Sequence, residues 1–390
     1  MRISATYFAL VFWAISLVSA ALLERRNIVE MMRKMSSPRP AGAAYVITNE
    51  PQENMVITAS IEGDGTVRRD RAIAAGGRGP HGVTANGNTG VDGLFSQGAI
   101  QVSTKSNVLA TANPGSSTVS LFSIDPRRPT NISHLGDPTS SEGEFPASLA
   151  FNADGSRLCV LIGGAVNGVK QEARPDPIPN SLRYLGFNQT TPANGPPNSV
   201  SQIIFSEDGS KLLVSYKGPG TAPGYLASWD VQKDGSLSAR HTQGPLPSGG
   251  MLAFSLTPIP KENVFFVTDP GIGFDIVDLG GKRRSAAGTI NGQMATCWSA
   301  HIAKTGSYCA IDTHSVPAKT SPIDSQVGTV GGKDHLYVLD ANSTSVDILA
   351  QTAAGQARQI SKVDISGRAR AVGIPLHAAN IQGMSTYVAQ

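Results

Sequence analysis

Two eight-residue segments of this chain are identical at five of their eight positions. Phe151–Leu158 reads Phe-Asn-Ala-Asp-Gly-Ser-Arg-Leu, and Phe205–Leu212 reads Phe-Ser-Glu-Asp-Gly-Ser-Lys-Leu. In both, Asp-Gly separates two apolar runs, which predicts a β-hairpin with a type I′ turn. Looser copies begin at Val102, Phe254 and Ile302, so the hairpin recurs every 48 to 54 residues.

Each period has room for a third and a fourth strand. Third-strand candidates are Ser120–Ile124, Tyr225–Trp229 and Phe274–Asp278, and the more polar Ser236–Arg240 and Lys282–Ser285 are fourth-strand candidates. The 42 glycines and 25 prolines suit short strands joined by turns, and charged residues, at 16%, are too few for a coiled coil or a charge-driven disordered chain. Four antiparallel strands recurring about every 50 residues predict an all-β fold, a β-propeller.

The two ends of the chain are predicted to share one blade. Ala44–Thr48 and Met55–Thr58 resemble second and third strands, and Ile374–Ile381 resembles a first strand. Sharing a blade removes the exposed strand edges of an open ring. We expect a single propeller domain over 41–390, with six blades if 313–334 is an insertion and seven as the alternative.

The N-terminus is typical of a secretion signal. The apolar run Tyr7–Val18 is short for a membrane span, and small residues precede a cleavage position after Ala20. We predict a signal peptide over 1–20, with a signal anchor as the alternative, and a pro-segment or disordered linker over 21–40. The expected location is extracellular or the lumen of the secretory pathway, with no stable membrane anchor.

Charge argues against nucleic acid as a partner. The net charge is +3, but the first 40 residues alone carry +4, so the rest of the chain is close to neutral. A near-neutral body without a basic stripe does not suit a polyanion. Three sequons predict glycosylation at Asn131, Asn188 and Asn342, none of them on an expected innermost strand.

The three cysteines predict one disulfide if the protein is secreted. Cys297 and Cys309 flank a hairpin centred near Lys304–Gly306, so we expect these two to be bonded. Cys159 lies in an apolar run and is expected to be a buried free thiol. No sequence pattern predicts a metal site or a cofactor.

The repeat resembles the propeller lactonase superfamily, which includes bacterial 6-phosphogluconolactonase and fungal carboxymuconate cyclase. The residues that carry the resemblance are the two Asp-Gly hairpins, Asp92–Ala99, Tyr337–Asn342 and Ala44–Asn49. The resemblance implies a secreted, fungal-type propeller, and those families are usually seven-bladed and act on phosphorylated or polycarboxylate substrates. They often place a Pro-His or Pro-Arg pair where Pro80-His81 stands here.

The expected channel is uncharged, unlike what such anionic substrates require. The predicted innermost strands contain no Lys, Arg, Asp or Glu; they are Ser96–Gln101, Phe145–Leu149, Asn198–Gln202, Gly250–Phe254, Cys297–His301 and Ile374–His377. An anion there would lose hydration without gaining a counter-charge. We therefore expect a small, largely uncharged ligand in the central pocket.

Candidate site residues are taken from these strands and from the Pro-His pair. His81, His301 and His377 are the acid–base candidates. Gln97 is the candidate to polarise a carbonyl group. Asn198, Gln202 and Trp298 are the candidates for binding the substrate. Asp269 and Asp312 end second strands, where a role in a turn is expected.

The sequence leaves two classes of function open. One is a secreted, monomeric glycoprotein enzyme for cyclisation, isomerisation or lactone chemistry on a small molecule, with a Diels–Alder-type cyclase of secondary metabolism as a variant. The other is a non-catalytic secreted adhesin or antigen; a cyclase or lactonase for anionic substrates is a further alternative. Convergence of the candidate residues on one mouth favours an enzyme. Scatter of these residues, or a plugged channel, favours a binding protein.

Overall fold

The structure is a computed structural model that describes residues 39–173, 178, 181–313, 320–371, 373, 374 and 376–388. Residues 40–390 make one compact unit. The predicted signal peptide and nearly all of the predicted pro-segment lie outside the described residues.

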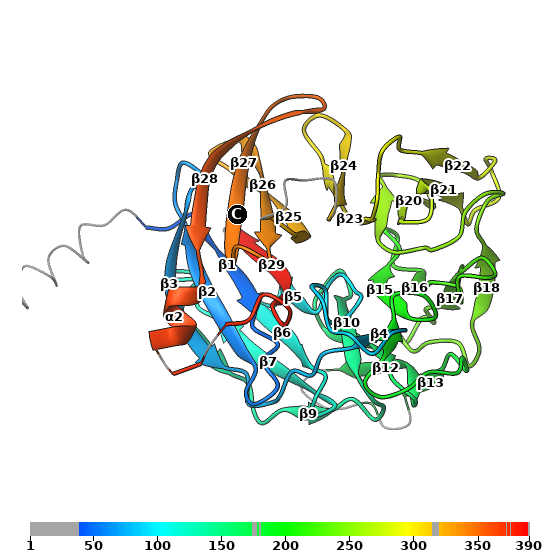
Figure 1. The fold of residues 1–390 in the computed structure, drawn as a ribbon, viewed down its shortest axis with the longest axis horizontal. Helices are drawn as coiled ribbons and strands as arrows, with labels where there is room; N and C mark the ends of the chain where they lie inside the picture. The colour runs from blue at the N-terminus through cyan, green and yellow to red at the C-terminus, as the bar shows by residue number, and fades with distance from the viewer. Residues whose placement is uncertain are drawn as a thin grey trace, which may run out of the picture. The chain divides into compact units, whose positions relative to one another are not determined.

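The described residues form six four-stranded antiparallel blades arranged in a ring (Figure 1), as the repeat predicts. Blade 1 holds β29 (Gln382–Val388), β1 (Gly42–Ile47), β2 (Met55–Ile61) and β3 (Val67–Ala74). Blade 2 holds β5 (Ile100–Ser103), β6 (Val108–Asn113), β7 (Thr118–Ile124) and β8 (Ile132–His134), and the short β9 (Thr139–Ser140) also pairs with β7. Blade 3 holds β10 (Pro146–Phe151), β11 (Arg157–Gly163), β12 (Asn167–Ala173) and β13 (Arg183–Tyr184).

The remaining blades follow in chain order. Blade 4 holds β15 (Val200–Phe205), β16 (Lys211–Tyr216), β17 (Tyr225–Asp230) and β18 (Thr242–Pro245). Blade 5 holds β19 (Leu256–Ile259), β20 (Val264–Asp269), β21 (Gly273–Asp278) and β22 (Ala286–Thr289). Blade 6 holds β25 (Pro322–Val330), β26 (Lys333–Asp340), β27 (Ser345–Ala353) and β28 (Gln356–Asp364).

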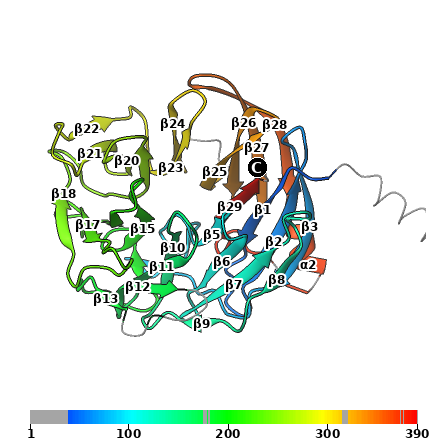
Figure 2. The ribbon, with the colours of Figure 1, turned by 180° about the vertical axis from the view of Figure 1, so that it is seen from behind.

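A two-stranded hairpin stands in the ring between blades 5 and 6. It consists of β23 (Thr296–Ile302) and β24 (Ser307–Asp312), and Figure 2 shows it from behind. The expectation that 313–334 is an insertion is wrong, because β25 lies within it and is the innermost strand of a complete blade. Within the described residues, the unit that begins at Ile302 contributes only this hairpin.

The two faces of the ring differ in what they carry. Turns between first and second strands, and between third and fourth strands, form the turn face. Links between blades form the connector face, together with the parallel pair of β4 (Val83–Thr84) and β14 (Asn194–Gly195) and the short helix α2 (Ser366–Ala371). The link from blade 1 to blade 2, residues 75–99, is called the first connector below.

The Asp-Gly turns build the hairpins, although not as type I′ turns. Gly155 has φ +72° and Gly209 has φ +69°, and the positive-φ residues of the described chain do not include the preceding aspartates. Asp154 Oδ1 instead accepts a hydrogen bond of 2.8 Å from Ser156 N, and Gly155 N donates to Asn152 O. A three-residue type I turn with glycine in the left-handed position fits this pattern.

Ring closure uses both ends of the chain, as predicted, but through a different strand. β29 pairs antiparallel with β1, with Gly42 opposite Val388. Ile374–Ile381 is not a strand, because the N–H groups of Asn380 and Ile381 both bond to His377 O in a turn. β29 follows that turn and supplies buried Met384 to the core.

Candidate functional site at the propeller axis

Small residues bring the innermost strands close together at the axis. Pairing registers shift within β10, β15, β23, β25 and β29, which indicates a bulge in each of these strands. Buried serines stand at or beside these bulges: Ser148, Ser201, Ser299, Ser325 and Ser385. A Cβ atom on Gly98 of the first connector would lie 2.8 Å from Gln101 Nε2 and 3.1 Å from Ser148 Oγ. Little room is therefore left for a wide channel.

Side chains from the first connector cross the axis. Gln97 Nε2 donates to Ser299 O at 3.1 Å, and Ser299 N donates to Gln97 Oε1 at 3.3 Å. Trp298 Nε1 donates to Ser96 O at 3.2 Å. Gln97 leads into blade 2, and Ser299 belongs to the hairpin. Three blades separate blade 2 from the hairpin in one direction around the ring, and two blades separate them in the other. The axis is thus closed at this level by the protein's own amide groups.

A fully buried lysine holds the first connector in place. Lys217, directly after β16, donates from Nζ to Phe95 O at 2.8 Å, to Val200 O at 3.2 Å and to Ser201 Oγ. Its Nζ also lies 4.6 Å from the centre of the Phe254 ring. Burial lowers the pKa of Lys217 to about 7, and the Asp92 carboxylate acts in the opposite direction. Three acceptors match the three protons of an ammonium group, so the protonated amine has a full set of partners within the fold.

Two buried carboxyl groups lie at the axis, so the channel is not uncharged as expected. Asp92 Oδ1 accepts hydrogen bonds from Gln382 Nε2 at 2.9 Å and from Ser96 N at 3.2 Å, and burial raises the pKa of Asp92 to about 6. Asp324, in the bulge of β25 with φ +53°, accepts from Met384 N at 3.0 Å. Burial raises the pKa of Asp324 to about 7.

The three candidate histidines lie in three different places. His81, in the first connector, faces the carbonyl oxygens of Gly82 and Gly90. His301 lies near the turn-face end of β23 and its ring is 4.8 Å from that of Tyr308. His81 and His301 therefore do not form one acid–base site.

His377 was expected on an innermost strand, and this is wrong. It lies in the turn before β29, and its Nδ1 is 2.9 Å from Glu50 Oε2. Asn380 Nδ2 donates to the same oxygen at 2.8 Å. The His377 side chain is 60% exposed whereas that of Glu50 is 6% exposed. This cluster fastens the C-terminal turn to the loop between β1 and β2.

The candidate amides are used within the fold. Asn198 Oδ1 accepts from Tyr216 OH at 2.7 Å, and its Nδ2 donates to Asn188 O at 2.8 Å. Gln202 Oε1 accepts from Leu256 N at 2.6 Å and so joins blade 4 to blade 5. Of the seven candidates, the structure brings Gln97 and Trp298 together at the axis.

The expected disulfide is absent. All three cysteines lie within the described residues, and Cys159, Cys297 and Cys309 are each free. The register of β23 and β24 places Cys309 opposite Ala300, three residues from Cys297. Cys159 is fully buried, as predicted.

Carboxylates at the ends of second strands hold the connectors, which is the turn role expected of Asp269 and Asp312. Asp269 Oδ2 accepts from Met251 N at 2.6 Å and Leu252 N at 3.0 Å. Asp312 accepts from the N–H groups of the link between blade 5 and the hairpin. Beside Asp269, burial and the Asp269 charge raise the pKa of Asp275 to about 8. Neither Asp275 oxygen has a hydrogen-bond donor in the described part of the chain.

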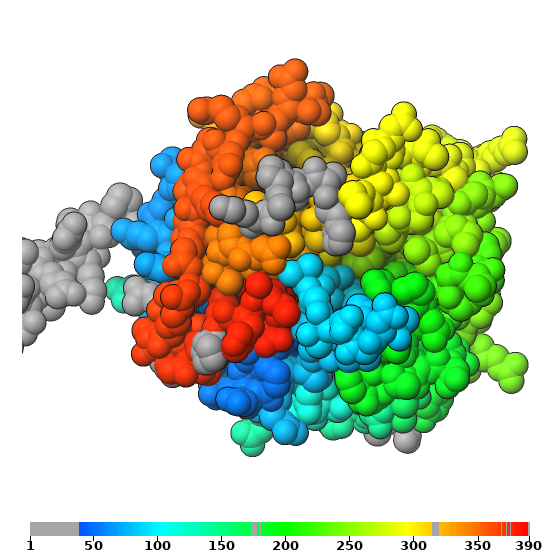
Figure 3. Space-filling model, viewed as in Figure 1, coloured from blue at the N-terminus to red at the C-terminus, as the bar shows by residue number. Residues whose placement is uncertain are grey.

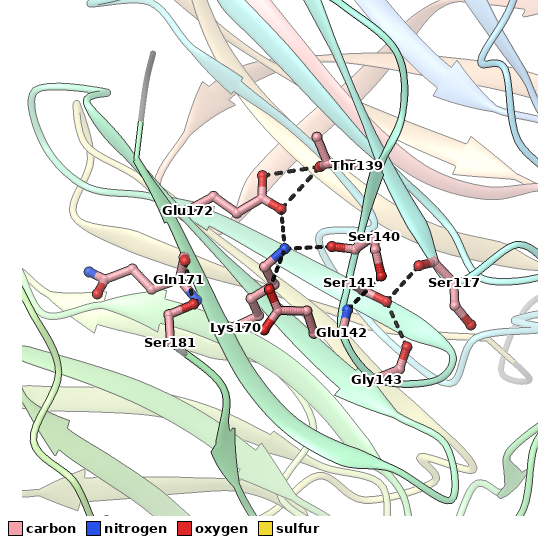
Figure 4. A network of polar contacts seen from close by, with 10 residues as sticks. All are labelled: Ser117, Thr139, Ser140, Ser141, Glu142, Gly143, Lys170, Gln171, Glu172 and Ser181. Atoms are coloured by element: carbon pink, nitrogen blue, oxygen red, sulfur yellow. Dashed lines mark hydrogen bonds and ion pairs between the residues drawn. The ribbon is translucent and has the colours of Figure 1, made fainter. Parts of the chain in front are cut away.

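A second buried lysine joins blade 3 to the link before it (Figure 4). Lys170 Nζ lies 3.0 Å from Glu172 Oε1 and 3.5 Å from Glu142 Oε1, and it also donates to Ser140 O. Thr139 Oγ1 donates to Glu172 Oε1 at 3.0 Å. The buried charges of Lys170 and Glu172 are matched to each other, and the second carboxylate, that of Glu142, is exposed to solvent, which points to a structural role.

The three predicted glycosylation sites lie on the surface. Asn131, Asn188 and Asn342 are all exposed. No helix in the described residues has the length and apolar character to span a bilayer. Within the same residues, no three His, Cys, Asp or Glu side chains are grouped so as to hold a metal ion.

The connector face is covered by chain segments near the axis. In Figure 3 the light-blue first connector lies near the middle of this face, beside the red residues around β29. The axis residues therefore lie beneath the connectors.

Comparisons with known proteins show the fold and no family. No family model and no curated protein matches the chain. The periplasmic gluconolactonase of Pseudomonas aeruginosa matches with 13% identity and a TM-score of 0.57, over 89% of this chain and 100% of that chain. A putative 6-phosphogluconolactonase of Bacteroides uniformis matches with 11% identity and a TM-score of 0.44, over 88% of this chain and 84% of that chain. The chain is thus similar in fold to a lactonase propeller.

Proposed function

We propose that this protein is a secreted glycoprotein that recognises its partners through its surface and does not turn over a substrate at the propeller axis. The observation that carries the proposal is the pair of hydrogen bonds between Gln97 and Ser299 across the axis. A substrate there would have to replace these bonds, and buried amides that lose their partners are costly.

The distribution of reactive groups supports the same proposal. His81, His301 and His377 lie apart, and each faces groups of the fold itself. The protons of Lys217 are all donated to acceptors from the chain. Acid–base catalysis needs a group within hydrogen-bond reach of the reacting atom, and these residues do not share such a position.

Secretion and glycosylation belong to the proposal. They are supported by the N-terminal sequence and by the exposure of the three sequon asparagines. Expression in a eukaryotic secretory host should yield protein in the medium whose mass falls on enzymatic removal of N-glycans. Replacement of one sequon asparagine by Gln should reduce this fall in mass by the mass of one glycan.

A lactone-directed or cyclising enzyme is the second candidate. It is favoured by Asp92 and Asp324, two buried carboxyl groups with raised pKa values, because perturbed acids often mark active sites. The gluconolactonase named above has a similar fold. Such an enzyme would have to move the first connector off the axis. An uncharged substrate is no longer favoured, because Asp92 and Asp324 place carboxyl groups at the axis.

Turnover assays separate the two candidates. The purified full chain is incubated with glucono-δ-lactone, 6-phosphogluconolactone and carboxymuconate, beside Asp92→Asn and Asp324→Asn variants. We expect no rate above that of buffer. Turnover by the wild type that either variant abolishes would overturn the proposal in favour of the enzyme.

A further inference from the structure

β24 differs from the second strands of all six blades in its exposure. In β1, β6, β11, β16, β20 and β26 every residue after the first is buried. No residue of β24 is buried, and Ala310 is exposed. The difference arises because no third strand pairs with β24 within the described ranges. Within those ranges, the outer N–H and C=O groups of 307–311 form an open sheet edge.

The wall formed by blade 5 beside this edge is apolar and only half covered. In β21, Asp275 and Val277 are buried, and Val277 packs against blade 4. Phe274 and Ile276, on the other side of the strand, are half-buried. This side faces the hairpin, because Phe266 of the same sheet face contacts the Tyr308 ring at 5.2 Å.

The wall formed by blade 6 is also half covered, but it is partly polar. In β27, Val346 and Ile348 are buried against blade 1, while Leu349 and Gln351 are half-buried. This second side faces the hairpin, since Gln351 Nε2 donates to Thr305 Oγ1 at 3.1 Å. Each wall extends two strands further from the axis than β24 does. The result is a slot with a strand edge at its base, an apolar wall at blade 5 and a partly polar wall at blade 6, which we call the β24 slot.

Hollows lie at both ends of the β24 slot. At the connector face, a hollow of about 390 Å³ is lined by residues that include Ile290, Thr296, Ala310 and Pro322. A smaller hollow of about 110 Å³ at the turn face is lined by residues that include Lys304, Lys333 and Asp334. These two hollows leave room for a chain that runs along β24.

On the blade 6 side, the charge at the turn-face end of the slot is positive. Lys304 and Lys333 are exposed there. Asp334 is buried and already accepts hydrogen bonds from Thr329 Oγ1 at 2.6 Å and from Lys304 N at 3.3 Å. The accessible charge therefore comes from the two lysines, which suits an acidic group on an occupant.

Three third strands of this protein end in such an acid or directly before one. β7 is followed by Asp125, and β17 and β21 end at Asp230 and Asp278. Third strands run from the connector face to the turn face, so these acids lie at the turn face. In blade 4, Asp230 Oδ1 is 2.8 Å from Lys211 Nζ at the start of the second strand. An occupant of the β24 slot could make the equivalent ion pair with Lys304 or Lys333.

We propose that the β24 slot binds an extended segment of a partner polypeptide, which adds to β24 as an antiparallel third strand. Its alternate side chains are apolar, and its C-terminal end carries a carboxylate beside Lys304 and Lys333. A whole second copy of this protein does not fit, because blades 5 and 6 project past β24 on both sides. The inference deepens the proposed recognition function by naming a site and a class of partner.

A peptide from the protein itself tests this site. The probe is a fluorescently labelled peptide of residues 117–125, which contains the third strand of blade 2 and Asp125. We expect saturable binding to the purified full chain, measured by fluorescence anisotropy. The same peptide with Pro in place of Ser120 and Phe122 should not bind, because it cannot form the ladder.

Charge reversal in the protein tests the polarity of the site. A Lys304→Glu/Lys333→Glu variant should bind the peptide at least fivefold more weakly than the wild type. The peptide with Asp125→Lys should bind this double variant with the lost affinity restored. Lys105→Glu, in the matching turn of blade 2, is the control and should leave affinity unchanged. Ala310→Arg, at an exposed position, should block the slot and abolish binding while circular dichroism stays unchanged.

Two results would overturn the inference. One is absence of peptide binding, or binding that is the same in the double lysine variant and in Ala310→Arg. The other is concentration-dependent dimerisation in sedimentation experiments that the peptide prevents, which would make a second copy the occupant. The lactone assays test the proposed function separately, so failure at the slot leaves their result intact.

Discussion

The side chain of Gln97 and the backbone of Ser299 are 202 residues apart in sequence and bond to each other across the propeller axis. The two hydrogen bonds are reciprocal, since the amide nitrogen of Gln97 donates to the Ser299 carbonyl and its oxygen accepts from the Ser299 N–H. One side chain thereby satisfies the buried N–H and C=O groups of Ser299, which lies on a strand of the two-stranded hairpin.

Gln97→Ala should destabilise the fold substantially. It removes both hydrogen bonds and leaves the Ser299 N–H and C=O buried without partners, at about 1–3 kcal/mol for each group. We expect a loss of roughly 2–4 kcal/mol in the free energy of unfolding, measured by urea denaturation. Replacement of the exposed Gln356 by Ala is the control and should change stability by less than about 0.5 kcal/mol. A stability loss equally small in Gln97→Ala would show that the axis is open in solution.

Lys217 and Asp92 should behave as a linked pair. Lys217→Met removes the cation and leaves the carbonyl oxygens of Phe95 and Val200 without this hydrogen-bond donor. We expect a loss of roughly 3–5 kcal/mol in the free energy of unfolding. Asp92→Asn alone leaves the buried ammonium without its counter-charge. The double variant should be more stable than the sum of the two single losses predicts. A double-mutant cycle with no coupling would contradict the pairing of these charges.

Much of the fold could be predicted because its signals are local. The hairpins around Phe151 and Phe205 carry their own turn residues, and the period between them implies the ring. The closing strand could not be recognised in the same way. β29 contains Gln382, Gly383 and Ser385 and looks less apolar than Ile374–Ile381. Its assignment depends on pairing with β1, at the other end of the chain.

The charged residues at the axis were missed for a related reason. Asp324 lies in 313–334, which the expectation of six blades treats as an insertion, whereas the structure places the innermost strand of blade 6 there. Lys217 follows the second strand of blade 4, and its acceptors come from Phe95 and Val200, far away in sequence. A lone lysine that continues a buried apolar strand was the available signal for such a cation. The histidines stood out by residue type alone, which does not determine where side chains meet.

Loss of β29 should be far more damaging than loss of the N-terminal segment. A chain that ends at Ile381 leaves β1 as an unpaired edge and removes Met384 and Tyr387 from the core. We expect a lower melting temperature and a broader, less cooperative transition by calorimetry. Removal of residues 21–38 should have little effect on either quantity. Equal stability of the two truncated chains would refute closure through blade 1.

Asp275 should make stability depend on pH. Its pKa in the folded protein is raised to about 8, whereas that of an unfolded aspartate is about 3.9. The unfolded state therefore releases this proton more easily, and the fold loses stability as the pH rises from about 4 to about 8. Asp275→Asn keeps the shape without a titrating group. Its stability should match that of the wild type near pH 4 and exceed it by roughly 3 kcal/mol at pH 8.5, after allowance for partial solvent screening.

Asp278→Asn, at the exposed end of the same strand, is the control, because its carboxylate accepts hydrogen bonds that hold its pKa low. Chemical denaturation of the three proteins across this pH range measures the difference. A variant that loses stability at pH 8.5 would mean that Asp275 is ionised in the fold and that a cation, absent from the residues described around it, compensates its charge.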